Sequence, residues 1–394
     1  MTSSVHIAKN VYGGDGLGRL GDGRVIFVAG AFAGEEVRAE IVEERKGYVK
    51  ARLVEVVDAS EERIEPGGLV VPGMVYARMK YAGEMRAKEA QLAEFFERAR
   101  IQIPKIENLS DERVSDHYRN KVVYHFAKQD GGWVLGYRKE PSHEIVDVVE
   151  DPLARLEINA ALGEIRKNVF TLLTQGAWAV RKSIEEKADV TIRWTARTGV
   201  KWWIGEAKDD VVLKETTLKK VFEVPAGGFY QVNPVAGEAL VKAVVDAFKA
   251  RPTEEVLDLY CGVGVFGLCC APVKLTGIES GRRAIEFARR NAASQGYGAA
   301  HFFAEQVGRN TRRIHIGAQT TVIVDPPRGG LERGVPEWLA VSKAPRIFYV
   351  SCDPATLMRD LRVITRTYEV EAVKWGNMFP RTARFETLVV LRRK

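Results

Sequence analysis

The feature that most constrains the fold is an apolar segment that runs into a glycine-rich turn and, further on, a second apolar segment that ends in an acid. Residues 254–259 read as a buried strand, and Gly262 and Gly264 follow it. Glycine lets the backbone approach a ligand closely where a Cβ would clash. Residues 275–279 form the next expected strand, and its last residue, Glu279, can accept hydrogen bonds from both hydroxyls of a ribose. This order predicts an α/β domain that binds a nucleoside-like cofactor.

The glycine spacing also narrows the choice of cofactor. The turn is Gly-x-Gly and lacks the third glycine of the dinucleotide fingerprint. The pattern therefore favours S-adenosyl-L-methionine over NAD. A lone turn of this kind is weak evidence, and it gains weight here because the strand, the helix and the acid follow in the right order.

Two further apolar segments end in acidic or nucleophilic residues. Residues 321–324 run into Asp325 and two prolines, and acid-Pro-Pro at a strand end is a known mark of methyltransferases that act on planar nitrogen or ring atoms. Residues 346–350 lead to Cys352, after which Pro354 allows a helix to start. Because ligands lie at the carboxyl ends of strands in α/β folds, we expect Cys352 to face a site. The alternative is a small cysteine buried in the core.

Four short motifs resemble those of the RNA uracil-C5 methyltransferases and occur in the order found in that family. They are Gly228-Phe229-Tyr230-Gln231-Val232-Asn233-Pro234, Asp325-Pro326-Pro327-Arg328, Ser351-Cys352-Asp353-Pro354 and Arg384-Phe385-Glu386-Thr387. Residues 118–121 also look like the central domain of the family, so the resemblance covers nearly the whole chain. It implies an enzyme that uses S-adenosyl-L-methionine to make 5-methyluridine in ribosomal or transfer RNA.

The residue types in these motifs fit that chemistry. C5 of uracil is a poor nucleophile, and a thiolate that adds to C6 converts the ring into an enolate that can attack a methyl group. Cys352 is the candidate nucleophile, and polar surroundings or a helix N-terminus would favour its thiolate. The C5 proton must then leave, and Glu386 is the expected general base, unless it is a carboxylate on a solvated strand edge. The family histidine two positions earlier is Arg384 here, which leaves the protonation of Glu386 open.

Further site residues are expected around this pair. Asp325 and Gln231 can hold the uracil edge or the cofactor, although Gln231 could instead serve a turn beside Asn233. Gln306 can bond the adenine, with Glu305 as its rival. The expected cofactor-binding residues are Gln231, Tyr260, Gly262, Gly264, Glu279, Gln306 and Asp325. The residues expected at the target base are Phe229, Gln231 and Asp325, and no metal ligand is expected.

The chain departs from the family pattern where many members hold an iron–sulfur cluster. Residues 71–74 read Val-Pro-Gly-Met where those members have Cys-Gly-Gly-Cys, and Asp151 stands where the last cluster cysteine would precede Pro-Leu. The cysteines of this chain are Cys261, Cys269, Cys270 and Cys352. We therefore expect no iron–sulfur cluster.

The sequence divides into three parts. Residues 1–60 read as short alternating strands and resemble the TRAM domain, a small OB-like barrel that binds RNA. Residues 61–228 are expected to form a mixed, largely β central domain, with a helix at about 87–100 that packs on the catalytic domain. Residues 229–394 read as a class I, Rossmann-like methyltransferase domain. The fold class predicted is therefore α/β, with an added N-terminal barrel.

The charge balance agrees with an RNA partner. The 394 residues include 59 Lys and Arg against 52 Asp and Glu, a net charge of +7 that suits a polyanion, although ordinary surface charge could account for much of it. Arg119 and Lys121 are candidate RNA contacts, with solvated strand residues as the alternative. The start lacks a signal peptide and no apolar run approaches about 18 residues, so we expect a cytoplasmic protein without a membrane partner. We expect a monomer.

The leading interpretation is an RNA uracil-5-methyltransferase that acts on 23S ribosomal RNA. The N-terminal barrel favours ribosomal over transfer RNA, and a transfer RNA uridine-C5 methyltransferase is the first alternative. An RNA-binding or RNA-folding factor with vestigial methyl transfer is the second. A small-molecule methyltransferase on the same catalytic fold is the third, and the N-terminal barrel weighs against it.

Overall fold

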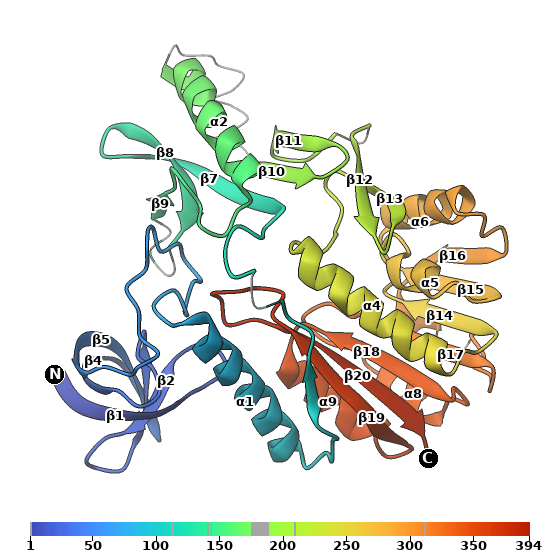
Figure 1. Cartoon of the computed structure of the whole chain (residues 1–394), viewed down its shortest axis with the longest axis horizontal. Helices are drawn as coiled ribbons and strands as arrows, with labels where there is room; N and C mark the ends of the chain where they lie inside the picture. Colours follow the sequence, from blue (N-terminus) through green and yellow to red (C-terminus); the bar gives the residue numbers. More distant parts are fainter. Residues whose placement is uncertain are drawn as a thin grey trace.

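The fold has three parts, which are visible in Figure 1: a barrel, a central sheet with a long helix, and an α/β unit that ends at the C-terminus. The computed structural model describes residues 2–111, 114–139, 142, 144–174, 189–208, 210–310 and 313–394. Among these residues, no helix combines the length and the apolar character that crossing a membrane requires. The same residues contain no group of three or more His, Cys, Asp and Glu side chains that could hold a metal ion.

The N-terminal residues form a closed barrel. In the order β1-β2-β3-β5-β4, its strands are β1 (Thr2–Asn10), β2 (Gly16–Arg19), β3 (Val25–Ala29), β5 (Tyr48–Asp58) and β4 (Glu36–Arg45). Alternating side chains such as Val5, Ile26 and Val37 are buried inside it. Gly18 lies where β1 and β2 approach closely, because a Cβ there would lie 2.5 Å from the carbonyl oxygen of His6. The predicted N-terminal barrel is confirmed.

A long helix, α1 (Tyr81–Ala99), follows the barrel and lies between it and the catalytic sheet (Figure 1). Leu92 and Phe96 are buried in the core of the catalytic unit. The helix expected at about 87–100 thus begins earlier, at Tyr81. The sequence does not predict this earlier start, because Gly83 lies in the first turn and glycine is a poor helix former. Here a Cβ at Gly83 would lie 2.5 Å from the Glu62 carboxylate, so glycine lets the linker pack closely on the start of the helix.

The central part is a five-stranded antiparallel sheet, and the helix α2 (Leu156–Thr174) packs on it. In sheet order, its strands are β11 (Gly199–Ile204), β10 (Asp189–Thr195), β7 (Lys121–Gln129), β8 (Gly132–Arg138) and β9 (Ile145–Asp147). The helix buries Ile158 and Leu162 against Val190 and Ile192 of β10. A separate hairpin of β12 (Val212–Thr217) and β13 (Lys220–Pro225) leads into the catalytic unit.

The catalytic unit is built on an eight-stranded sheet with the order β16-β15-β14-β17-β18-β20-β19-β6. Its strands from the C-terminal part are β14 (Glu255–Leu259), β15 (Lys274–Glu279), β16 (Ala300–Ala304), β17 (Thr320–Val324), β18 (Arg346–Ser351), β19 (Tyr368–Gly376) and β20 (Glu386–Arg393). Strands β14 to β18 run parallel, and β20 is antiparallel to both of its neighbours. Every residue of β17 and β18 is buried, as expected for strands covered on both faces.

Helices cover both faces of this sheet. One core contains side chains from α4 (Pro234–Ala250), α5 (Val265–Cys270) and α6 (Arg282–Ser294). The core on the other face contains side chains from α1, α7 (Val307–Asn310), α8 (Val335–Val341) and α9 (Pro354–Ile364). The predicted class I, Rossmann-like methyltransferase fold is confirmed.

The last strand of the sheet, β6 (Ile106–Asn108), comes from an unexpected part of the chain. It pairs in parallel with β19, and Glu107 forms an ion pair of 2.8 Å with Lys374. These residues fall in the region 61–228, which was predicted to form the central domain. A strand of three residues is too short to show the alternation that would have predicted it. The segment that precedes the central sheet in the sequence therefore supplies an edge strand of the catalytic sheet.

Candidate active site

A cavity of about 970 Å³ lies at the carboxyl ends of the central strands of the catalytic sheet. Its wall also includes the segments around Lys208 and Phe229, which lead out of the central part. The predicted site residues that line it are Phe229, Gln231, Tyr260, Gly262, Glu279, Asp325, Cys352 and Glu386. The predicted residues outside its wall are Arg119, Lys121, Gly264 and Gln306.

The two glycines of the turn after β14 have different surroundings. Gly262 has φ of +53°, and nothing lies within 4 Å of the position a Cβ would take, so its backbone faces open space at the cavity. Gly264, at φ of +88°, caps α5, and a Cβ there would lie 3.1 Å from Leu268 and 3.3 Å from Phe302. Gly262 therefore allows close approach of a ligand, whereas Gly264 allows the turn to pack.

The acid at the end of β15 is held in place by its own turn. Oε1 of Glu279 accepts hydrogen bonds from the backbone N–H of Gly281 at 2.8 Å and from Oγ of Ser280 at 3.0 Å. The Glu279 side chain lines the cavity, where binding of a ribose would require its carboxylate. Gln306 is exposed and directly precedes Val307, which lines the cavity. Its contact with adenine stays a prediction.

Phe229 and Gln231 reach the cavity from the segment between β13 and α4. Phe229 is 71% exposed, so its ring offers a free face at the cavity. Gln231 packs over Gly237, where a Cβ would lie 2.8 Å from Cβ of Gln231. The side chain of Asn233 accepts a hydrogen bond from the N–H of Ala236 at 3.2 Å and caps α4. Asn233 therefore supplies the side-chain hydrogen bond of this turn, a role that was considered as the alternative for Gln231.

Asp325, Cys352 and Glu386 form an acidic group in the cavity, and they follow or begin three different strands, β17, β18 and β20. Burial raises the pKa of Asp325 to about 7, and the charges of Asp258 and Glu279 contribute to the rise. Burial and the neighbouring Asp325 also raise the pKa of Glu386 well above its ordinary value. The group therefore resists carrying several negative charges at once.

The thiol of Cys352 is subject to the same effect. Burial raises its pKa to about 12, and the charges of Glu386 and Asp325 contribute to the rise. The sequence led us to expect help from a helix N-terminus. However, Asp353 caps α9 by accepting hydrogen bonds from the N–H groups of Ala355 and Thr356, both at 3.0 Å. The ligand-free protein therefore holds Cys352 as a neutral thiol.

Alkylation of Cys352 should report this protonation directly. Because only the thiolate reacts, we expect the rate of its modification by iodoacetamide to rise about tenfold per pH unit between about pH 7 and pH 10. The substitution Glu386→Gln removes the negative charge that Glu386 carries where it is ionised, so at alkaline pH it lowers the pKa of Cys352 and speeds the reaction. Peptide mass spectrometry would follow Cys352 beside the buried Cys269 as an internal control. A rate that levels off near neutral pH would contradict this assignment.

Two arginines that sequence reasoning left without a role face the acidic group. Arg328 and Arg384 both line the cavity, and their positive charges lower the pKa values of Cys352 and Glu386. The sequence signal was present, since Arg328 follows Asp-Pro-Pro directly and Arg384 replaces a family histidine.

The sequence also contained no indication of the role of Asp258, which is buried in β14. It accepts a hydrogen bond of 2.9 Å from the N–H of Gly267 and holds the glycine turn against β14.

The predicted RNA contacts in the central part lie away from the cavity wall. The guanidinium of Arg119 lies 5.9 Å from the ring centre of Tyr118, and Lys121 is half-buried near Arg193. Between them, the N–H of Asn120 donates to the carbonyl of Val232 at 2.8 Å. This motif therefore ties the central part to the segment that carries Gln231, and the role of Arg119 and Lys121 in RNA binding stays a prediction.

Residues 71–74 and Asp151 stand where many members of the resembled family have cluster cysteines. In this structure they make ordinary protein contacts. Val71 and Met74 are buried in the core of the central part. The buried carboxylate of Asp151 accepts hydrogen bonds from the hydroxyls of Tyr124 at 2.9 Å and Tyr137 at 2.7 Å. It also accepts one from the N–H of Leu153 at 2.8 Å. Apolar packing and one carboxylate thus hold this region together.

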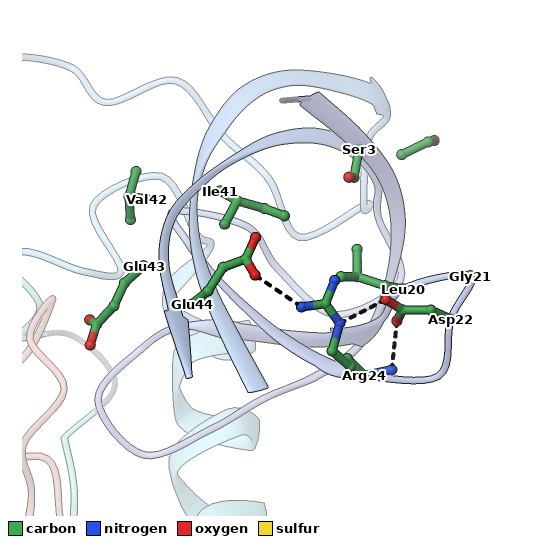
Figure 2. Close-up of a pocket in the computed structure, with 10 residues that line it drawn as sticks. Ser3, Leu20, Gly21, Asp22, Arg24, Ile41, Val42, Glu43 and Glu44 are labelled. Carbon is green, nitrogen blue, oxygen red and sulfur yellow. Dashed lines mark hydrogen bonds and ion pairs between the residues drawn. The ribbon is translucent and has the colours of Figure 1, made fainter. Parts of the chain in front are cut away.

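A second hollow, of about 490 Å³, lies on the barrel and is shown in Figure 2. Of the described residues that line it, Arg24 is the single cation, and Asp22, Glu43 and Glu44 are acidic. Arg24 is already paired with Asp22 at 2.7 Å and with Glu44 at 3.2 Å. This hollow therefore offers little to a polyanion, and it contains none of the predicted site residues.

The fold and the cavity together define a class of protein, the S-adenosyl-L-methionine-dependent methyltransferases. The structure is similar to the crystal structure of Pyrococcus abyssi tRNA (uracil-54, C5)-methyltransferase in complex with S-adenosyl-L-homocysteine. The TM-score is 0.74 at 22% sequence identity, and the match covers 98% of this chain and 100% of that chain. At this level of identity the likeness shows the fold.

The sequence comparisons identify the family within this class. The tRNA (Uracil-5-)-methyltransferase family matches residues 175–394, and the TRAM domain matches residues 4–54. An uncharacterized RNA methyltransferase of Streptomyces coelicolor is 30% identical over 433 residues, which cover 98% of this chain and 92% of the relative. The 23S rRNA (uracil(1939)-C(5))-methyltransferase of Chromohalobacter salexigens is 30% identical over 432 residues, covering 98% and 88%. The chain belongs to the RNA uracil-5-methyltransferases and is an enzyme that uses S-adenosyl-L-methionine.

Proposed function

We propose that this enzyme methylates C5 of a uridine in 23S ribosomal RNA through a covalent bond between Cys352 and C6 of the base. The single observation that supports this best is the meeting of Cys352, Asp325 and Glu386 in one cavity with the glycine turn and Glu279. A nucleophile, a base and a nucleoside site are the parts that the reaction needs. All of these residues come from one chain, so the proposal requires no second copy.

The cavity residues fit the methyl donor. Open space at Gly262 admits the nucleoside, and the carboxylate of Glu279 can accept from the ribose hydroxyls. When bound, S-adenosyl-L-methionine supplies a methyl group on a sulfonium cation. Asp325 would hold that positive charge or the edge of the uracil. Positive charge beside Asp325 and Glu386 would also lower the pKa of Cys352, since it offsets the two charges that raise it.

The proposed reaction proceeds in three steps at the base. The thiolate of Cys352 forms a bond to C6, and the electrons of the C5–C6 double bond shift toward the C4 carbonyl. C5 then forms a bond to the methyl carbon while the bond from that carbon to the donor sulfur breaks and its electron pair stays on the sulfur as a neutral thioether, so that C5 carries both a methyl group and a proton. The carboxylate of Glu386 removes that proton, the C5–C6 double bond reforms, and the thiolate of Cys352 leaves. Arg328 and Arg384 stabilise the negative charge of the thiolate before and after this cycle.

The base must leave its stack to reach Cys352. The exposed ring of Phe229 at the cavity provides an apolar surface against which an extruded uracil can stack. Unstacking costs least in loops and single strands, so we propose a target in an unpaired region.

Ribosomal RNA is the proposed substrate because of the relatives. The 23S rRNA enzymes of Chromohalobacter salexigens and Methylococcus capsulatus match nearly the whole chain, the latter at 29% identity over 442 residues. The barrel, which favoured ribosomal RNA in the sequence, does not by itself distinguish the two substrates. The Pyrococcus abyssi tRNA enzyme shares the fold over 98% of this chain, barrel included. Transfer RNA is therefore the second candidate.

A labelling experiment tests the proposal. The purified protein is incubated with tritiated-methyl S-adenosyl-L-methionine and total RNA from a strain that lacks the gene. The labelled RNA is sized and digested to nucleosides. We expect label in 5-methyluridine and in RNA of 23S size. Label confined to transfer RNA would support the second candidate, and label in another nucleoside, or none, would contradict the proposal.

A further inference from the structure

The loop of residues 377–385, which joins β19 to β20, carries part of the active site. Phe379 and Arg384 of this loop line the cavity, and Glu386 follows it as the first residue of β20. Arg381, in the middle of the loop, has φ of +66°, a left-handed conformation that is costly for a residue with a Cβ. Contacts around the loop must therefore hold this conformation in place.

The main contact is the ammonium group of Lys88, on α1. Lys88 is fully buried. Its Nζ donates to Oδ1 of Asn377 at 2.7 Å, to the carbonyl of Phe379 at 3.3 Å and to the carbonyl of Arg384 at 3.0 Å. It also lies 2.7 Å from Oε1 of Glu84, one helical turn earlier, so its three N–H groups are shared among four oxygen acceptors. One ammonium group thus joins the beginning, the middle and the end of the loop.

Glu84, which is also fully buried, completes the network from the acceptor side. Its carboxylate accepts from Nδ2 of Asn377 at 2.8 Å and from the backbone N–H of Arg381 at 3.0 and 3.1 Å. These bonds reach the residue with the strained backbone. Burial lowers the pKa of Lys88 and the charge of Glu84 raises it again, so the charge of Lys88 depends on Glu84.

Further contacts to the loop also come from outside the strands that carry the reacting groups. The N–H of Tyr76 donates to the carbonyl of Arg381 at 3.0 Å, and the hydroxyl of Tyr118 donates to the carbonyl of Pro380 at 3.1 Å. The N–H of Asn377 donates to Oγ of Ser110 at 2.7 Å. The linker and the central part therefore hold an active-site loop that belongs to the catalytic sheet.

We propose that the buried Lys88–Glu84 pair is a positioning device of the active site, which fixes the 377–385 loop so that Arg384 and Glu386 face Cys352. This inference rests on the proposed function, in which those residues take part in methyl transfer. A buried ion pair is often no more stabilising than apolar residues of similar volume. Stability alone is therefore a weak reason for this pair, and its bonds to Asn377, Phe379, Arg381 and Arg384 indicate geometry as its role.

Three variants separate positioning from simple stabilisation. Lys88→Met and Glu84→Gln each remove one charge, and the double variant removes both without leaving an unpaired charge. The control is Arg98→Met, which removes an exposed ion pair to Glu94 of the same i, i+4 spacing on the same helix. Each protein is assayed by single-turnover methyl transfer, by binding of S-adenosyl-L-homocysteine and by thermal unfolding.

We expect Lys88→Met to slow single-turnover methyl transfer by at least about tenfold, because small displacements of reacting groups can cost up to about 100-fold. Affinity for S-adenosyl-L-homocysteine should change by less than about twofold, since Gly262 follows β14 and Glu279 ends β15, so neither belongs to the 377–385 loop. Arg98→Met should match the wild type in both. If Lys88→Met does not fold, the double variant is used for the same comparison.

The pH dependence gives a readout that stability would not change. The charged groups that face Cys352 are Glu386, Asp325, Arg328 and Arg384, and Tyr12 of the barrel lies near enough to interact with it. When the loop loosens, Glu386 and Arg384 both move away from Cys352, and because Glu386 has the larger effect on the pKa of the thiol, the rising limb of the single-turnover profile should move to lower pH. Arg98→Met should leave the profile in place.

The outcomes for the two proposals are distinguishable. If Lys88→Met or the folded double variant binds cofactor and matches the wild type in rate and pH profile, the positioning role is overturned. The pair would then serve stability only, whatever its effect on thermal unfolding. If the wild type makes no 5-methyluridine, or if Cys352→Ala still does, the proposed function fails independently of Lys88.

Discussion

Replacing Cys352 with alanine is expected to reduce formation of 5-methyluridine by at least about 10⁴-fold. Without the sulfur, no bond forms to C6, and C5 stays too weakly nucleophilic to take a methyl group. The measurement is the initial rate of tritium transfer from S-adenosyl-L-methionine to RNA, followed by nucleoside analysis. The same reactions, run on a denaturing gel with labelled RNA, should show no covalent complex.

The matched control for this variant is Cys269→Ala. Both changes remove one sulfur atom, but Cys269 lies in the core on the α4–α6 side of the sheet, away from the cavity wall. It should lower thermal stability slightly and leave the methylation rate within a fewfold of the wild type. Methylation by Cys352→Ala at more than about a tenth of the wild-type rate would contradict covalent catalysis by this residue and favour a different nucleophile.

The backbone of the site was predictable because its signals are local. The turn at Gly262, the acid Glu279 and the strand end at Asp325 each follow a short apolar run. In a parallel sheet the carboxyl ends of neighbouring strands meet at one edge, so their order in the sequence indicates a shared site. The structure brings these strands together as β14, β15 and β17.

The parts that escaped prediction depend on contacts between distant residues. Lys88 and Asn377 are 289 positions apart, and nothing near either residue in the sequence indicates that they meet. The strand β6 joins the sheet through three residues, and Gly83 interrupts the propensity of α1 because Glu62 packs on it. In each case tertiary packing, and not the local sequence preference, determines the structure.

The electrostatics of the site were also beyond the sequence. The order Ser-Cys-Asp-Pro places Cys352 beside a helix N-terminus, which by itself would favour a thiolate. The structure adds Asp325 and Glu386 from two other strands, and their charges act in the opposite direction. Under the proposed mechanism, the neutral thiol of Cys352 would become reactive as the positive charge of the methyl donor enters the cavity, which would limit unwanted oxidation or alkylation of Cys352 between turnovers.

The substitution Glu386→Gln is expected to stop the reaction at its last step, the removal of the C5 proton. The amide has nearly the shape of the carboxylate but cannot accept the C5 proton, so the methylated base stays bound to Cys352. We expect multiple-turnover methylation to fall by about 10² to 10⁴-fold. A complex of protein and RNA that survives denaturing electrophoresis should accumulate at the same time, and its label should come from the methyl group of S-adenosyl-L-methionine.

Stability provides the internal control for this variant. Burial raises the pKa of Glu386 well above its value in the unfolded chain, so the folded state favours the protonated form. Its contribution to stability is therefore largest at acidic pH and is lost as the pH rises from about 4 toward the folded pKa. The amide of the Glu386→Gln variant does not ionise, so the variant should unfold at a temperature equal to or higher than that of the wild type at about pH 8. A stable Glu386→Gln protein that turns over at the wild-type rate and traps no RNA would assign proton removal to another group, with Asp325, whose pKa is raised to about 7, as the next candidate.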